Sequence, residues 1–171
     1  MSLADKNVLM IVSPAGFQEE EYFIPKQILE NSKANVQTAS LRETATSVNG
    51  KTIRTDLILA QANANNYDAV IFVGGPGAAV YLNNIDAFNL IKNALLGNKI
   101  VAAICLAPSI LANSGILKNK KATVFPSEKD NLVRKGAIYT GKNVEIDGKI
   151  ITANGPQSAK EFGNAIVKAL N

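Results

Sequence analysis

The chain has 171 residues, of which 47% are hydrophobic and 19% are charged, with 18 Lys and Arg against 14 Asp and Glu. This length and composition predict one globular domain over residues 1–171 with a sizeable core. No apolar run approaches the roughly 20 residues of a membrane-spanning helix, and the N-terminal residues lack the apolar region of a signal peptide. We therefore expect a cytoplasmic protein that does not associate with a membrane.

The cysteine and histidine content excludes several classes of site. The sequence has one cysteine, Cys105, and no histidine. It therefore cannot form an internal disulfide bond or a usual zinc site, and we expect no metal and no other cofactor. A Cys–His or Ser–His–Asp catalytic arrangement within the chain is excluded.

The net charge of +4 is weak support for nucleic acid binding. The basic residues are scattered, apart from a cluster of Lys118, Lys120 and Lys121. No aromatic residues alternate with them to form a stacking platform. We do not expect a nucleic acid partner.

The first forty residues predict a β-α-β unit. Residues 7–12 are a short apolar run typical of a strand, residues 17–32 have a helical pattern, and residues 36–39 predict a second strand. Pro25 lies inside the helical pattern. The helix should bend there, which would leave the backbone carbonyl of Glu21 without its usual partner.

The middle of the chain predicts an edge excursion and a second β-α-β unit. Residues 41–66 are polar and carry an Asn-Gly turn signal, which favours a small hairpin. Residues 67–73 predict a buried strand and are followed by the turn G-G-P-G-A. A helical pattern over residues 85–96 leads to a strand that ends at Ile104.

The C-terminal part predicts short strands and two helices. A Ser127 start and a Gly136 stop favour a helix over residues 127–135, and Gly155-Pro156 opens a helix that runs to Leu170. Strands are expected at residues 121–126, 137–140, 144–146 and 149–153. Together the elements predict an α/β sandwich in which helical layers enclose a mostly parallel sheet.

Cys105 follows the apolar run Val101–Ile104 and precedes a helical segment. Pro108 is tolerated only in a first helical turn, so the helix should start within a residue or two of the thiol. Backbone N–H groups and the helix dipole would then favour the ionised thiol. A lone buried cysteine is also a common packing residue, but the position on a strand-to-helix turn favours a functional thiol.

Ligands bind beyond the carboxyl ends of the strands in an open α/β sheet. Three turns meet at that edge, at residues 13–21, 74–78 and 105. We interpret Glu19 and Glu20 as charges that favour a helix start. Glu21 should point inward, on the helix face that also carries Ile24 and Ile28, and burial should raise the pKa of its carboxyl group so that it can donate a proton to a thiolate.

The glycine turn that begins at Gly74 matches neither a P-loop nor a complete dinucleotide-binding motif. We interpret it as part of an anion or oxyanion pocket formed by Gly74, Gly75 and Leu106. The N–H groups of Gly75 and Leu106 would face a developing negative charge beside Cys105.

The chain resembles the DJ-1/PfpI family over essentially its full length. The segments that carry the resemblance are E-Y-F-I-P, F-V-G-G-P-G-A, A-A-I-C-L-A-P, K-A-T-V-F-P-S-E-K-D and I-D-G-K-I-I-T-A-N-G-P. The last two are more similar to the DJ-1 side of the family than to the peptidase side.

The resemblance implies a flavodoxin-like three-layer α/β/α fold and a homodimer. It also implies that Cys105 is a reactive cysteine on a nucleophile elbow and that Glu21 is its protonated hydrogen-bond partner. Members of the family are described as oxidation-sensing or stress-protective proteins, as glyoxalases or deglycases that act on small reactive carbonyls, as chaperones and as peptidases.

The chain departs from the family pattern at Leu106 and Phe125, where PfpI-type peptidases and DJ-1-like members respectively place a histidine. We expect Phe125 and Pro126 to line an apolar pocket. Our first hypothesis is a DJ-1-like stress-response protein whose thiol meets an oxidant or a small carbonyl substrate, as a weak glyoxalase or deglycase. The alternatives are a catalytically inactive, chaperone-like binding protein and an intracellular cysteine peptidase.

Overall fold

The computed structural model describes residues 2–171. Within these residues a central sheet has seven strands. Each strand is parallel to its neighbours except β11, which is antiparallel to β12. The order across the sheet is β11 (Val144–Asp147), β12 (Ile150–Ala153), β8 (Ile100–Ile104), β7 (Ala69–Phe72), β1 (Asn7–Ile11), β3 (Asn35–Ser40) and β6 (Leu57–Ile58).

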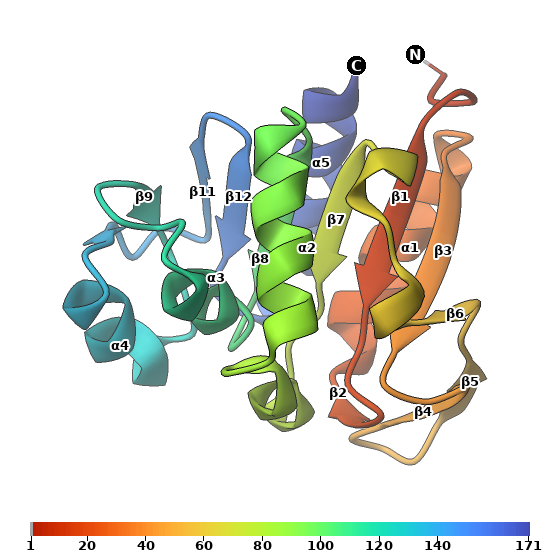
Figure 1. The fold of residues 1–171 in the computed structure, drawn as a ribbon, viewed down its shortest axis with the longest axis horizontal. Helices are drawn as coiled ribbons and strands as arrows, with labels where there is room; N and C mark the ends of the chain where they lie inside the picture. Colours follow the sequence, from red (N-terminus) through yellow and green to blue (C-terminus); the bar gives the residue numbers. More distant parts are fainter. Residues whose placement is uncertain (1) are drawn as a thin grey trace.

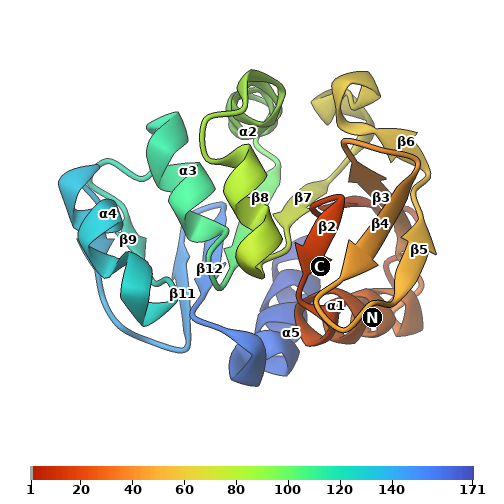
Figure 2. The same ribbon diagram turned by 90° about the horizontal axis from the view of Figure 1, so that it is seen from below.

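Helices cover both faces of this sheet. The helices α1 (Glu19–Asn31) and α5 (Ala159–Leu170) lie on one face, and α2 (Ile85–Leu96) and α3 (Pro108–Ser114) lie on the other (Figure 2). The central strands β1, β7 and β8 therefore bury side chains on both faces, which explains their continuous apolar sequences. The predicted three-layer α/β/α sandwich with a mostly parallel sheet is confirmed.

Smaller sheets extend the ends of the sandwich. The strands β2 (Ala15–Phe17), β4 (Thr44–Ser47) and β5 (Thr52–Arg54) form one of them. Its β4–β5 pair is the hairpin predicted in the edge excursion. The strands β9 (Lys121–Ala122) and β10 (Ile138–Tyr139) pair in parallel beside α4 (Lys129–Arg134), at the opposite end of the molecule (Figure 1).

The helix predicted from Ser127 begins instead at Lys129, after a 3₁₀ turn at Pro126–Glu128. Ser127 does not cap it, and the Glu128 carboxylate accepts a hydrogen bond from Ser109 Oγ at 2.9 Å. This contact with α3 fixes the turn. Other bounds are also shorter than predicted, since β9 ends at Ala122 and α5 follows a 3₁₀ turn at Pro156–Ser158.

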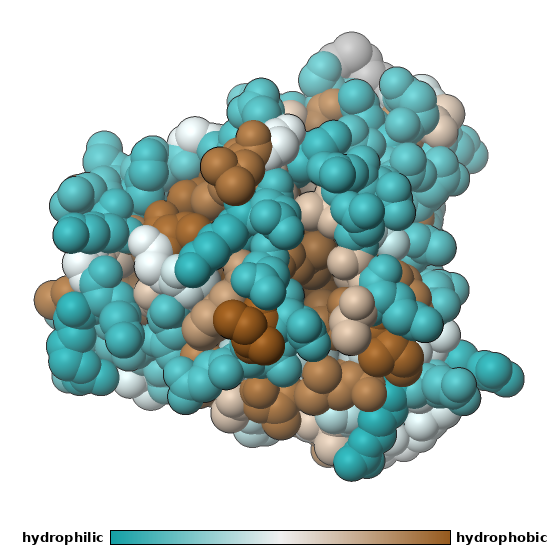
Figure 3. Space-filling model, in the orientation of Figure 1, coloured by the Kyte–Doolittle hydropathy of each residue, from teal (hydrophilic) through white to brown (hydrophobic). Residues whose placement is uncertain are grey.

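Hydrophilic side chains cover much of the face formed by α2 and α3, and apolar side chains are exposed between them (Figure 3). The most exposed apolar side chains are Leu96 at 86% and Ile85 at 66%, at the two ends of α2. Over residues 2–171, no helix is long and apolar enough to cross a membrane.

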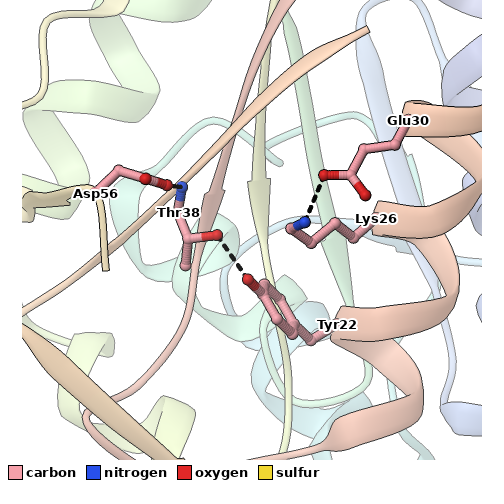
Figure 4. A network of polar contacts seen from close by, with 5 residues as sticks. All are labelled: Tyr22, Lys26, Glu30, Thr38 and Asp56. Atoms are coloured by element: carbon pink, nitrogen blue, oxygen red, sulfur yellow. Dashed lines mark hydrogen bonds and ion pairs between the residues drawn. The ribbon is translucent and has the colours of Figure 1, made fainter. Parts of the chain in front are cut away.

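A buried polar contact ties α1 to the sheet. The hydroxyl groups of Tyr22 and Thr38 share a hydrogen bond of 2.7 Å, and the Thr38 N–H donates to Asp56 Oδ2 at 2.7 Å (Figure 4). The side chains of Tyr22 and Thr38 are almost completely buried. Each hydroxyl group therefore depends on the other for a partner.

We predict that Tyr22→Phe lowers the free energy of unfolding by about 1–2 kcal/mol, because it leaves the buried Thr38 hydroxyl without its partner. Thr38→Val added to this variant should cause less further loss than Thr38→Val alone, since the orphaned hydroxyl is then removed. Urea unfolding of the four proteins measures the coupling. Strictly additive losses would contradict the interaction.

Candidate functional site

Three loops meet at the carboxyl ends of β1, β7 and β8, as the sequence predicts. The N–H of Gln18 donates to the carbonyl oxygen of Gly74 at 3.1 Å, which joins the first loop to the glycine turn. A Cβ atom at Gly74 would lie 2.7 Å from Cys105 Cβ and closer still to Glu21 Oε2. Gly74 therefore packs closely against both Glu21 and Cys105, and no larger residue fits there.

Cys105 occupies the turn between β8 and α3. Its φ of 64° lies in the left-handed region, which residues with a Cβ rarely adopt. Its N–H donates to the carbonyl oxygen of Ala153 at 2.9 Å, and its carbonyl oxygen accepts from the Phe125 N–H at 2.8 Å. These two bonds hold the turn, and α3 begins close to the predicted place, at Pro108.

Glu21 is fully buried at the start of α1. Within the described part of the chain, neither carboxyl oxygen meets hydrogen-bond geometry with any group. Burial raises the pKa of Glu21 to about 8, and the charge of Glu20 adds to this, while the nearby Cys105 thiol and Gly74 N–H lower it. Glu21 is therefore protonated at neutral pH, as the sequence analysis expects.

The inward orientation of Glu21 has a different origin from the one expected. Ile24 is 36% exposed and is not part of the buried face. The residues of α1 that are buried with Glu21 are Tyr22, Pro25 and Leu29. Glu21 thus lies on the face of α1 that packs into the core, next to the glycine turn.

The expected preference for the ionised thiol is wrong. Burial raises the pKa of Cys105 to about 12, and the negative charge of Glu21 is the next cause, whereas the N–H groups of Gly75 and Leu106 lower it. Burial thus outweighs the backbone N–H groups. Because protonated Glu21 carries no charge and has a proton to donate, the pKa of the thiol is lower beside protonated Glu21 than beside its carboxylate.

The backbone N–H groups of the predicted anion pocket face two different side chains. The N–H groups of Gly75 and Leu106 interact with the Cys105 sulfur, whereas the Gly74 N–H interacts with Glu21. Gly75 has a φ of 99°, and a Cβ there would lie 2.5 Å from the carbonyl oxygen of Gly16. The glycine turn therefore directs one N–H at each of the two reactive groups.

Phe125 and Pro126 lie beside the turn but are both exposed, and 42% of Phe125 is accessible. Phe125 touches the site through its backbone N–H. That its side chain lines a substrate pocket stays a prediction. No cluster of His, Cys, Asp and Glu side chains suitable for a metal ion occurs over residues 2–171.

Residues that lie far from Cys105 in the sequence support its turn. The Ser109–Glu128 hydrogen bond anchors the loop that carries Phe125, and the carbonyl oxygen of Ala153 accepts a hydrogen bond from the Cys105 N–H. These partners lie at least 19 residues apart in the chain. No local motif in the sequence indicates such contacts.

We predict that Gly74→Ala sharply slows labelling of Cys105 by iodoacetamide and lowers the free energy of unfolding by about 2 kcal/mol or more, because the added methyl group overlaps Glu21 and Cys105. Gly97→Ala is the matched control, since no heavy atom lies closer than 3.4 Å to a Cβ there. Equal labelling of the two variants would contradict the close packing at Gly74.

The pKa of Glu21 also predicts how stability depends on pH. Between about pH 4.5 and pH 8 the folded protein retains a proton that the unfolded chain has lost, so stability should fall as pH rises through this range. Glu21→Gln should remove this loss, which is roughly 5 kcal/mol over the whole range. Urea unfolding at several pH values compares the two proteins, and parallel curves would show that Glu21 ionises normally.

Comparison with known proteins agrees with this geometry. The sequence profile of the DJ-1/PfpI family matches residues 6–169. Protein dj-1beta of Drosophila melanogaster is 32% identical over 96% of this chain and 89% of the fly protein. A deglycase of Pyrococcus abyssi is 28% identical over 95% of this chain and 98% of its own length.

A solved structure extends the similarity to the whole fold. The crystal structure of a ThiJ/PfpI domain protein from Brachyspira murdochii matches this structure with a TM-score of 0.94 and 36% identity, and the match covers 96% of each chain. The chain belongs to the DJ-1/PfpI family.

Proposed function

We propose that the protein is a DJ-1-like stress-response protein in which Cys105 reacts with oxidants and, slowly, with small reactive carbonyls. The observation that carries this proposal is the arrangement of acidic and hydrogen-bond-donating groups around the Cys105 sulfur. A partly exposed thiol lies beside a protonated buried carboxyl group and the N–H groups of Gly75 and Leu106. The relative that is named a deglycase supports carbonyl chemistry.

A 2-oxoaldehyde would react in steps that this site can supply. The thiolate adds to the aldehyde carbon and forms a C–S bond, and Glu21 gives its proton to the aldehyde oxygen, which yields a hemithioacetal. The Glu21 carboxylate then takes the proton from that carbon and returns it to the neighbouring carbon, while the hydroxyl proton of the hemithioacetal passes to the neighbouring carbonyl oxygen, which yields a thioester. Water cleaves the thioester to a 2-hydroxy acid and restores the thiol.

Oxidation needs fewer proton transfers. The thiolate attacks one oxygen of a peroxide, an S–O bond forms as the O–O bond breaks, and the second oxygen leaves as water after it takes a proton. The product is a sulfenic acid, and a second peroxide oxidises it to a sulfinic acid. Gly75 and Leu106 would donate hydrogen bonds to the new oxygen atoms.

The absence of histidine from the sequence limits the rate of either reaction. A general base typically contributes about a hundred- to ten-thousand-fold, and a single carboxyl group must here give and accept every proton. We therefore propose weak carbonyl turnover and no significant peptidase activity. The raised pKa of the thiol favours a second candidate, a binding or chaperone-like member of the family that does not turn over a substrate.

We further infer that the chain is a single domain, forms a homodimer and works in the cytoplasm. The continuous sheet from β11 to β6 supports one domain. The family resemblance supports the dimer, which light scattering of the purified protein tests. A lone thiol that must remain reduced suits a reducing compartment.

We predict that intact mass shows added oxygen after mild peroxide and a transient carbonyl adduct after methylglyoxal, with lactate as the released product. Cys105→Ser should abolish both adducts. Glu21→Gln should slow lactate release at least about tenfold because it has no carboxyl proton to transfer, whereas Glu30→Gln, on the exposed side of α1, should not. Peroxide and carbonyl adducts without lactate would favour the non-catalytic candidate.

A further inference from the structure

The outer side of β3 is open along its amino-terminal half. Its outer neighbour β6 pairs only with Ala39 and Ser40, at the carboxyl end of β3 (Figure 1). No strand of the described chain lies beside residues 35–37 on this side. Natural sheets usually protect such an edge with charged residues or proline, but β3 contains neither. The edge is therefore free to pair with another chain.

The backbone of Val36 faces this open side. The N–H of Asn35 donates to the carbonyl oxygen of Lys6 at 2.9 Å and so faces β1, whereas the N–H and carbonyl groups of Thr38 both bond to Asp56, on the outer side. Backbone groups alternate in direction along a strand that pairs in parallel, so Val36 faces outward like Thr38. Within residues 2–171, no hydrogen bond reaches its N–H or its carbonyl oxygen. Val36 thus presents one free donor and one free acceptor.

A cleft of about 790 Å³ lies against this edge, and we call it the β3 cleft. It is bounded by residues 34–37 and by the segment 65–67, which follows β6 in the chain. The Tyr67 hydroxyl donates to Gln37 Oε1 at 2.7 Å, which holds the amide group of Gln37 in place. Five carboxamide side chains line the cleft, those of Asn7, Asn35, Gln37, Asn65 and Asn66.

We propose that the β3 cleft binds an extended peptide segment with polar, uncharged side chains, which adds to the sheet beside β3. The free backbone groups of Val36 provide the main-chain hydrogen bonds of such a complex. Carboxamides both donate and accept, so they suit Ser, Thr, Asn and Gln side chains. Glu30 is the only charged residue of the lining and is paired with Lys26, so neither sign of charge is favoured.

A planar base or a sugar ring fits the cleft less well than a peptide. Such ligands commonly stack on an exposed aromatic ring. Tyr67 is the only aromatic residue of the lining and is 5% exposed. An extended peptide needs no stacking surface, because its own backbone supplies the donors and acceptors that Val36 lacks.

Hydrogen exchange followed by NMR tests the edge directly. In the free protein, the amide of Val36 should exchange at least about tenfold faster than that of Gln37, which faces β1. The probe is a blocked peptide of alternating Thr and Gln. At saturation it should slow exchange at Val36 at least about tenfold, whereas the same peptide with a fully N-methylated backbone should not. Exchange at Val36 that neither peptide changes would overturn the proposal.

Two variants of the cleft should bind the probe more weakly. Val36→Pro removes the free N–H at an edge position where proline is tolerated, and should weaken binding about fivefold or more. Val36→Thr keeps the N–H and should bind normally. Asn66→Arg places a long side chain in the cleft and should weaken binding, whereas Asn83→Arg, exposed elsewhere, should not. Unchanged labelling of Cys105 by iodoacetamide shows that each variant is folded.

Three results would contradict the proposal. Equal binding of the probe to Asn66→Arg and Asn83→Arg would place the peptide elsewhere. Equally tight binding of peptides that alternate Thr with Glu or with Lys would refute the preference for uncharged side chains. A dimer that Val36→Pro converts to a monomer in light scattering, with no binding of the probe, would assign the edge to a second copy of this chain.

Discussion

A buried carboxyl group determines the properties of this site. Glu21 is fully buried, and its carboxyl group packs against Gly74 beside Cys105. Taking an ionised carboxylate out of water is so unfavourable that the group retains its proton instead. The site therefore contains an acid that is ready to donate near neutral pH.

The thiol and the carboxyl group act as one titrating pair. Burial raises the pKa of both groups, and the ionised form of Glu21 disfavours ionisation of Cys105. The pair thus loses its first proton as a unit and retains one proton. In a chain without histidine, this proton is the one that chemistry at the sulfur can use.

The sequence was sufficient to predict the central strands, the turn at Cys105 and the burial of Glu21. Strands β1, β7 and β8 are predictable because helices cover both of their faces, so their sequences are continuously apolar. The start of α4 and the length of β9 were mispredicted because contacts between distant residues, such as the Ser109–Glu128 bond, set these bounds. The direction of the Cys105 pKa was wrong because a sequence shows the helix that follows a thiol but not how deeply the thiol is buried.

The left-handed backbone of Cys105 has a consequence for stability as well as for chemistry. A glycine at this position would adopt the φ of 64° without the steric penalty that a Cβ atom incurs, which is on the order of 1 kcal/mol. Folding alone would therefore favour a chain that lacks its single thiol. The strained turn is a point of trade-off between stability and activity, and a selection for thermostability that ignored the thiol would tend to replace this residue.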